Sequence, residues 1–363
     1  MKPYNPELLP NLDLDWKIFR SQLGPANRSI ARFDGLLQSI PNPTVLLSPL
    51  TTQEAVLSSK IEGTQATLEE VLKFEADPKQ KTDKYQDIRE IINYRKAIKH
   101  AVEELEKKPL NLTLLKEMHS ILLDSVRGRN KSRGMFRTIQ NWIGRPGSSM
   151  EEARFVPPNP TVLLNHLDNF EYYINFDDED VLVQIAIAHA QFEILHPFLD
   201  GNGRIGRILI PLFLFSKNVL HTPMFYISGY LESHRDEYYD RLKNISDNGD
   251  WENWISFFLK AITEQSIENI EKSKAVLQLY ENMKHTVVDL THSQYALQAL
   301  DALFNSPIFS STDFQNNSSI PKASASRILS TLKEENVINL FQEGRGNRPS
   351  VYVFERLIEI VKT

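Results

Sequence analysis

The chain has 363 residues, of which 24% are charged and 41% hydrophobic, proportions that are ordinary for a soluble globular protein. This length allows two or three domains, each with its own core. The formal net charge of −6 argues against a protein that coats nucleic acid, and the absence of cysteine excludes disulfides, zinc ribbons and thiolate catalysis.

A cytoplasmic location without membrane contact is expected. A chain without cysteine fits a reducing compartment, and its first residues show no apolar signal segment. The longest apolar run, around 208–215, is too short to span a membrane.

The N-terminal part, residues 1–108, is predicted to be helical. Its first fifty residues are rich in proline and are expected to wrap around another part of the protein. A clear helix is predicted over 49–62, because Pro49 lies near its start and Gly63 can adopt the left-handed conformation that ends helices. The helices predicted in this part lie over 16–23, 26–40, 49–62, 67–74 and 84–107.

The middle part, residues 109–278, is predicted to be helical apart from one hairpin. Apolar and polar residues alternate over 136–143 and 153–156 on either side of a glycine- and proline-containing break, a pattern typical of a β-hairpin. The acidic residues 177–180 are interpreted as a helix start rather than a metal site. The predicted helices lie over 113–125, 162–173, 181–195, 205–218, 235–246 and 251–278.

The C-terminal part, residues 285–363, is predicted to have the helix, helix, helix, hairpin order of a winged helix. Residues 322–348 carry five basic and three acidic side chains, a net charge of +2 that is weak for DNA binding. A DNA reader and a dimerisation or target-docking module therefore both remain open. The predicted helices lie over 293–305, 309–315 and 321–335, and the predicted strands over 337–341 and 350–354.

The most informative stretch is 196–207, His-Pro-Phe-Leu-Asp-Gly-Asn-Gly-Arg-Ile-Gly-Arg, which lies between two apolar helices. A glycine-rich loop that enters a helix presents backbone N–H groups to an anion. Arg204 and Arg207 are three residues apart, so their side chains point to one side of that helix. The loop therefore predicts a phosphate-bearing ligand.

Two further side chains of this stretch suit catalysis on a phosphate. Asp200 offers hard oxygen ligands of the kind that Mg²⁺ prefers. His196 is close to neutral at cellular pH and can accept a proton from an attacking hydroxyl. Together these groups predict phosphoryl or nucleotidyl transfer, in which positioning and charge stabilisation do most of the work.

Residues 196–207 resemble the signature of the Fic family, His-x-Phe-x-Asp-Gly-Asn-Gly-Arg-x-x-Arg, at every fixed position. The resemblance also covers the hairpin 134–160 and the flanking helices, and it points to bacterial members with a C-terminal winged helix. It implies a mainly α fold with a β-hairpin flap that aligns a target protein. The implied activity is protein adenylylation, in which AMP moves from ATP to a Ser, Thr or Tyr hydroxyl and pyrophosphate is released.

The resemblance implies a role for each residue of the motif. His196 is the general base, Phe198 is a buried anchor, and Asp200 holds Mg²⁺. Arg204 binds the β-phosphate, Arg207 binds the γ-phosphate, and a tyrosine contacts adenine. The implied ATP-binding residues are Gly201, Asn202, Gly203, Arg204, Ile205, Gly206, Arg207 and Tyr239.

A second motif, Ser58-x-x-x-Glu62-Gly63, matches the inhibitory motif of the same family. The resemblance implies that Glu62 pairs with Arg207 and withholds this arginine from the γ-phosphate of ATP. A carboxylate and a guanidinium form a strong, directional pair, so such competition is physically sound. Because the motif lies N-terminal to the catalytic stretch, inhibition is expected to act within one chain.

Several alternatives remain open. The same scaffold can use another nucleotide or remove AMP, and a winged-helix regulator of transcription can use a Fic core to sense nucleotide. A homodimer is implied by the family alone. For Tyr239, an adenine contact and core packing are equally good interpretations. His189 is expected to be a core histidine with satisfied hydrogen bonds.

Overall fold

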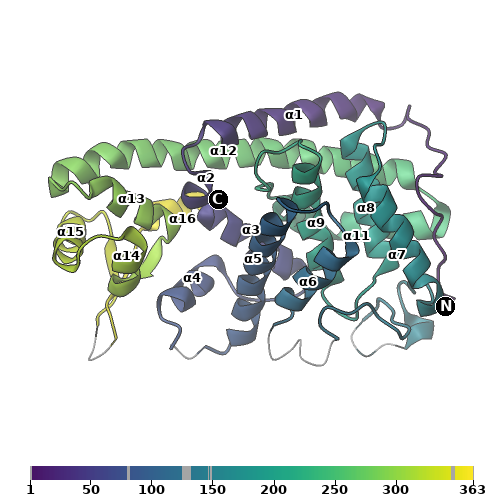
Figure 1. Ribbon diagram of the computed structural model, residues 1–363, viewed down its shortest axis with the longest axis horizontal. Helices are drawn as coiled ribbons and strands as arrows, with labels where there is room; N and C mark the ends of the chain where they lie inside the picture. Colours follow the sequence, from purple (N-terminus) through teal and green to yellow (C-terminus); the bar gives the residue numbers. More distant parts are fainter. Residues whose placement is uncertain are drawn as a thin grey trace. The chain divides into compact units, whose positions relative to one another are not determined.

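The computed structural model describes residues 2–79, 82–124, 132–145, 147, 149–344 and 348–362. These residues form a mainly helical fold with a small sheet near the C-terminal end of the chain, which confirms the prediction of a mainly α protein (Figure 1). None of the helices in these ranges is long and apolar enough to cross a membrane.

The chain forms two compact units whose segments alternate along the sequence. The first unit contains Met1–Gly35, Leu57–Gly63 and Asn93–Ile267, and the second contains Leu36–Val56, Thr64–Ile92 and Glu268–Thr363. The division into three domains predicted from the sequence stays a prediction.

The first unit is helical and holds the motif residues 196–207. Its core lies around α8, where every residue except Val181 and Glu193 is buried, and α8 packs against α7, α9 and α11. The helices that lie wholly or partly in this unit are α1 (Arg20–Ser39), α3 (Ser48–Ile61), α5 (Tyr85–Leu105), α6 (Leu112–Leu122), α7 (Pro160–Asn175), α8 (Val181–Leu195), α9 (Asn202–Ser216), α10 (Ser228–Ser233), α11 (Arg235–Asn248) and α12 (Trp251–Thr291).

The second unit combines short helices with a three-stranded antiparallel sheet of order β1-β3-β2. In the sheet, Phe309 pairs with Tyr352, and Leu340 pairs with the same residue from the other side. Helix α4 packs against β1, and α13 packs against α14. The elements that lie wholly in this unit are α2 (Pro43–Leu46), α4 (Leu68–Ala76), α13 (Ala296–Asn305), β1 (Ile308–Ser310), α14 (Ser311–Ser318), α15 (Lys322–Glu334), β2 (Asn339–Gln342), β3 (Val351–Val353) and α16 (Glu355–Lys362).

The N-terminal helices differ from the prediction. The two short helices expected over 16–23 and 26–40 are one helix, α1, with Pro25 inside it. A proline in a helix removes one backbone hydrogen bond, but tertiary packing of an apolar face supplies most of a helix's stability. Here Ala26, Ile30 and Phe33 are buried and hold the helix together across the proline.

The predicted hairpin over 136–156 is reduced to one antiparallel bridge. Ile143 N–H donates to Phe155 O at 2.8 Å, and Phe155 N–H donates to Ile143 O at 3.1 Å. A 3₁₀ turn, Met150–Glu152, forms in the connection between them. The expected tip lies partly outside the described residues, as do Ser125 at the end of one predicted helix and 345–347 at the tip of the C-terminal hairpin.

The C-terminal elements follow the predicted order. Three helices, α13 to α15, precede the paired strands β2 and β3. The sequence analysis missed β1, which has three residues, and α16, which follows β3 directly. Short elements of this kind show too few periods for a pattern to be recognised.

Candidate active site

The motif 196–207 connects the C-terminus of α8 to the N-terminus of α9. His196 ends α8 with a left-handed backbone, φ 44°, and Gly201 precedes α9 with φ 78°. The Asn202 side chain closes the loop, because its Oδ1 accepts from Phe198 N–H and its Nδ2 donates to Phe198 O, both at 2.8 Å. Phe198 is fully buried, as expected for an anchor.

His196, the predicted base, lies at the start of this loop. Burial lowers the pKa of the His196 imidazole to about 4, so the ring is neutral at pH 7 and has one nitrogen that can accept a proton. Its Nδ1 atom is buried and has no hydrogen-bond partner in the described part of the chain. The ring therefore has the protonation state that a general base needs.

Arg137, which the sequence analysis did not single out, holds the backbone on which His196 lies. Its guanidinium is buried and donates to His196 O at 3.0 Å, to Leu195 O at 3.3 Å and to Pro158 O at 2.6 Å. Burial lowers the pKa of Arg137 to about 10, which leaves the side chain charged at pH 7. A cation at the last carbonyls of α8 also offsets the negative end of the helix dipole.

The segment 137–141 makes further hydrogen bonds to the loop that follows His196. Arg137 N–H donates to Pro197 O at 2.8 Å, and Asn141 Nδ2 donates to Phe198 O at 3.1 Å. Because these donors bond to the loop, the segment does not extend its pairing with 153–156 into a regular hairpin. Apolar and polar residues alternate in the same way in a paired strand and in an extended segment that bonds to a loop. The prediction of a regular hairpin was wrong for this reason.

His119 fixes the far end of the same loop. Its Nδ1 accepts from Gly134 N–H at 2.9 Å, so the proton of the neutral ring is on Nε2, which donates to Asp200 O at 3.0 Å. The ring stacks on Phe198 with a centroid distance of 3.8 Å. Burial lowers the pKa of His119 to about 4, which keeps this single tautomer. His119 and Arg137 are positioning residues that no sequence pattern indicated.

Asp200 carries the carboxylate that the sequence analysis assigned to Mg²⁺. Its side chain is 41% exposed, and Oδ1 lies 3.3 Å from Arg204 Nη2. Within the described residues, no cluster of three or more His, Asp or Glu side chains forms a complete cation site. An exposed carboxylate beside a phosphate nest fits Mg²⁺ nonetheless, because this ion usually binds one or two carboxylates together with water and nucleotide phosphates.

Arg207 is the most completely enclosed of the predicted phosphate ligands, with 1% of its side chain exposed. Its Nη2 donates to Glu62 Oε1 at 2.6 Å and to Ser58 O at 2.9 Å, and its Nε donates to Ser58 Oγ at 2.9 Å. Burial opposes the charge of both partners, but their mutual attraction outweighs it. The pKa of Glu62 is therefore lowered from its ordinary value, and that of Arg207 is raised.

Glu62 reaches Arg207 from the residues that follow α3. The helix ends at Ile61, and Gly63 has φ 98°, a left-handed value that favours glycine at this stop. A Cβ atom added to Gly203 would collide with Glu62 Oε1. The carboxylate thus lies directly against the first turn of α9, where the sequence analysis expects phosphates.

Two predicted ATP-binding residues face elsewhere. Ile205 is fully buried and its N–H donates to Gly201 O at 3.1 Å, so neither its side chain nor its backbone donor is directed at a phosphate. Gly206 packs against α8, where a Cβ atom would collide with Glu193. Of the predicted ATP-binding residues on α9, Gly203, Arg204 and Arg207 therefore remain candidates for anion binding.

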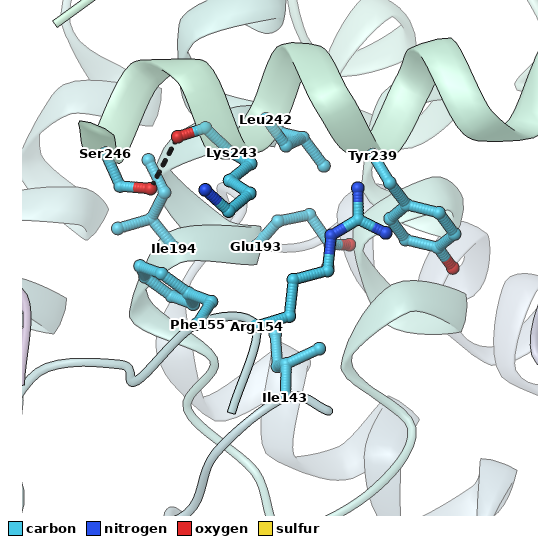
Figure 2. A pocket seen from close by; sticks show the side chains of 9 residues that line it. All are labelled: Ile143, Arg154, Phe155, Glu193, Ile194, Tyr239, Leu242, Lys243 and Ser246. Atoms are coloured by element: carbon cyan, nitrogen blue, oxygen red, sulfur yellow. Dashed lines mark hydrogen bonds between the residues drawn. The ribbon is translucent and has the colours of Figure 1, made fainter. Parts of the chain in front are cut away.

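A pocket lies between α8, α11 and the bridge at Ile143 (Figure 2). The pocket and its mouth contain about 450 Å³ of unfilled space, which includes open solvent. The residues that line it are Ile143, Arg154, Phe155, Glu193, Ile194, Tyr239, Leu242, Lys243 and Ser246.

Tyr239 lies in this pocket, whereas its neighbour Tyr238 belongs to the core. The Arg154 guanidinium carbon is 5.6 Å from the centroid of the Tyr239 ring, and burial raises the pKa of Tyr239 to about 12. Tyr238 Oη lies 2.9 Å from His189 Nε2, and His189 Nδ1 lies 3.0 Å from Gly206 O. The interpretation of His189 as a satisfied core histidine is confirmed.

The sequence of this chain matches a known protein family. Residues 20–103 match the family described as Fic/DOC family N-terminal, and residues 109–214 match the Fic/DOC family. The chain belongs to the Fic/DOC family.

Relatives and solved structures agree with this assignment. A probable protein adenylyltransferase of Aquifex aeolicus is 26% identical over 193 residues, which are 52% of this chain and 56% of that protein. Protein adenylyltransferase Fic of Drosophila grimshawi is 28% identical over 187 residues, 49% of this chain and 34% of that protein. The chain thus spans about half or less of the length of these relatives.

Two solved structures share the fold. A Fic family protein from Desulfovibrio desulfuricans aligns with a TM-score of 0.59 and 19% identity over 97% of this chain and 98% of its own. Fic-1 from C. elegans aligns with a TM-score of 0.53 and 21% identity over 70% of this chain and 72% of its own.

Proposed function

We propose that the protein is a protein adenylyltransferase, which moves AMP from ATP to a Ser, Thr or Tyr hydroxyl of a target protein or of itself. The observation that carries this proposal is the placement of a neutral His196 beside Asp200 and the N-terminus of α9. The names of the Aquifex and Drosophila relatives support the same activity.

The proposed reaction follows from the position of each group. His196 accepts the proton of the target hydroxyl, whose oxygen attacks the α-phosphorus of ATP, and the bond to the β-phosphate oxygen breaks to release pyrophosphate. The N–H groups at Gly203 and the side chain of Arg204 stabilise charge on the phosphates. Asp200 would hold Mg²⁺, which offsets negative charge on the phosphates when it is bound.

The proposal includes inhibition by Glu62. The Glu62 carboxylate occupies the space in front of Gly203 and accepts a charge-assisted hydrogen bond from Arg207. An arginine bonded in this way is not available to the γ-phosphate of ATP. Removal of the Glu62 carboxylate is therefore expected to increase AMP transfer.

The target protein is expected to bind along the segment 134–143, next to His196. Ile139 and Trp142 are 61% and 43% exposed in this segment, which leaves apolar side chains at its surface. For the C-terminal elements α13 to β3 we propose a winged helix that docks a target or a second copy, with DNA as the alternative ligand. The cytoplasmic location stays a prediction.

Transfer of label from ATP tests the function. The native protein, Glu62→Gly and His196→Ala are incubated with Mg²⁺ and ATP labelled at the α-phosphate. We expect weak labelling of protein by the native chain, stronger labelling by Glu62→Gly and none by His196→Ala. The exposed His285 on α12 provides a matched control, and His285→Ala should label as the native protein does.

Two outcomes would contradict the proposal. Label retained by His196→Ala would remove the base assignment, and equal labelling by the native protein and Glu62→Gly would remove the inhibition. The same assay with α-labelled GTP, CTP and UTP distinguishes another nucleotide from ATP. Loss of label after a chase with unlabelled ATP distinguishes removal of AMP from its transfer.

A further inference from the structure

The residues on both sides of the inhibitory segment, 57–63, belong to the second unit. The segment itself lies in the first unit and carries Glu62, whereas 36–56 and 64–92 lie in the second. Helix α3 therefore begins in one unit and ends in the other. Since the chain is covalently continuous, the freedom of Glu62 to leave Arg207 depends on how firmly the two flanks are held.

The flank that follows Glu62 is fixed at its third residue. Gln65 N–H donates to Asp87 Oδ2 at 2.8 Å, and Lys84 Nζ donates to Gln65 O at 3.0 Å. Both backbone polar groups of Gln65 are thus bonded to side chains at the start of α5. Asp87 is buried, so water does not readily replace its bond to the backbone.

Lys84 joins the same flank to α4. Its Nζ atom donates to Glu70 Oε1 and Oε2 at 2.8 and 3.0 Å, in addition to Gln65 O. Glu70 Oε2 accepts from Thr67 N–H at 2.8 Å, and Thr67 Oγ1 accepts from Glu70 N–H at 3.3 Å, which completes a capping box at the start of α4. A single ammonium group therefore links the residues after Glu62 to this helix.

Both flanks are attached to C-terminal elements of the second unit. Helix α4 packs against β1, and α2, which Leu47 alone separates from α3, packs against α13. Lys362 Nζ donates to Glu69 Oε1 at 2.7 Å, which joins α16 to α4. Lys73 Nζ on α4 lies 4.3 Å from the centroid of the Phe341 ring on β2. The elements proposed as a winged helix thus hold the helices on either side of the inhibitory segment.

We propose that the second unit regulates AMP transfer by fixing the position of Glu62, and that Asp87 and Lys84 are the positioning residues through which it acts. While both bonds to Gln65 are intact, the Glu62 carboxylate stays on Arg207. Displacement of α4 breaks or strains these bonds and allows Glu62 to leave α9. The inference rests on the proposed function, because it assigns the regulation of the same site.

This coupling has a form that can be measured. The pair of Glu62 and Arg207 has a closed and an open state, and an anchor that favours the closed state lowers the open fraction. Loss of the anchor raises the open fraction by as much as the anchor favoured the closed state. A protein without the Glu62 carboxylate has no pair to close, so loss of an anchor should not change its rate.

Labelling rates of anchor variants in two backgrounds test the inference. Asp87→Ala removes the acceptor of Gln65 N–H, and Lys84→Met removes the donor to Gln65 O. We expect each to raise labelling in the native background by roughly 2- to 10-fold, as for the loss of one hydrogen bond. Asp87→Asn keeps a side-chain oxygen and should stay close to the native rate. In the Glu62→Gly background, none of the three changes should alter the rate.

A variant of β1 tests whether the sheet takes part. Ile308 is 3% exposed and lines one pocket together with Glu69 and Lys73 of α4. Ile308→Ala leaves space between β1 and α4, so it should loosen this packing and raise labelling in the native background alone. Ile308→Val removes less volume and should act in the same direction, which keeps the test valid if Ile308→Ala does not fold.

A matched control and a measurement that does not need activity complete the test. Lys284→Met breaks an exposed pair with Glu281 on the part of α12 that lies in the second unit, and it should leave the rate unchanged. Hydrogen exchange, followed by mass spectrometry, reports directly how firmly 57–63 is held. Exchange in this segment should be faster in Asp87→Ala and Lys84→Met than in the native chain and in Lys284→Met.

The outcomes separate this inference from the proposed function. Unchanged exchange and labelling in Asp87→Ala and Lys84→Met would overturn the inference, while AMP transfer by Glu62→Gly would still support the function. An equal rise in both backgrounds would place the effect outside the inhibitory pair and overturn the inference as well. An unchanged rate for both Ile308 variants would remove the sheet from this regulation. If no variant transfers AMP, the proposed function and its regulation fail together, whereas faster exchange of 57–63 would still support the two anchors.

Discussion

Glu62 and Arg207 are 145 residues apart in sequence, and their Oε1 and Nη2 atoms are 2.6 Å apart. The two side chains differ in their access to solvent, since 32% of Glu62 is exposed but only 1% of Arg207. Glu62 can exchange its partner for water, whereas Arg207 would lose a bonded anion inside the protein. We therefore expect the carboxylate to be the side of the pair that moves, with a phosphate as its replacement.

Substitutions of Glu62 separate its charge from its volume. Glu62→Gln keeps the side-chain size and weakens the bond to Arg207, so we expect AMP transfer to rise. Glu62→Gly should raise it further, by roughly 10- to 100-fold, the range that a charge-assisted hydrogen bond provides. Initial rates of labelling measure both effects. Glu232→Gln, which breaks the pair between Glu232 and Lys60, is the control and should have no effect.

The substitution Ser58→Ala is expected to release Arg207 less completely than the Glu62 substitutions do. Ser58→Ala removes the acceptor at 2.9 Å from Arg207 Nε but leaves the backbone oxygen in place. We expect labelling to increase by roughly 2- to 10-fold, as for the loss of one hydrogen bond. The adjacent Ser59 is equally buried, but its Oγ has no hydrogen-bond partner in the described ranges, so Ser59→Ala should leave the rate unchanged. Equal effects of both changes would contradict a specific role for Ser58.

Arg137 should affect both stability and catalysis. Arg137→Met leaves the carbonyls of Pro158, Leu195 and His196 without a buried donor, at a cost of about 2–4 kcal/mol in the free energy of unfolding. Displacement of His196 should lower labelling by the folded variant at least roughly 10-fold. Denaturant unfolding and labelling rates measure the two effects. Arg133→Met breaks an exposed pair with Asp124 and an exposed hydrogen bond to Ser120 O, and it should change stability by less than about 1 kcal/mol.

Glu193 predicts a pH dependence of stability. Folding raises the pKa of this carboxyl from 4.5 to about 8, so between these values the folded state binds the proton more strongly than the unfolded state. Its contribution to stability is therefore most favourable below pH 4.5 and is lost as the pH rises toward 8. Glu193→Gln should be more stable than the native protein at pH 8 and similar to it at pH 4.5. Thermal unfolding at both values checks this, and an equal difference at both would contradict the raised pKa.

The sequence predicted α3, α5 to α9, α11 and α12 because their apolar periodicity is long, but it divided α1 into two helices and missed the short α10. Asp180, at the end of the acidic stretch 177–180, accepts from Leu182 N–H and Val183 N–H and so confirms the helix start expected there. The pairing of Glu62 with Arg207 was also predicted, since both residues belong to motifs that a single family links.

The positioning residues were not predicted, for a physical reason. Arg137 and His119 donate to backbone carbonyls of Pro158, Leu195 and Asp200, which lie 21 to 81 residues away in the chain. The pattern of side chains in a sequence does not show where backbone carbonyls lie. Burial raises the pKa of Glu193 to about 8, and only the three-dimensional arrangement reveals that burial.

The position of Ser58 and Glu62 in the same chain as Arg207 has a kinetic consequence. An intramolecular ligand has a fixed effective concentration, so dilution of the protein cannot release it. Opening of the pair is a first-order event. Under the proposed inhibition, the apparent affinity for ATP equals the affinity of the open form multiplied by the fraction of molecules that are open. Under the proposed inhibition, the enzyme would respond to the ATP concentration around it and not to its own abundance.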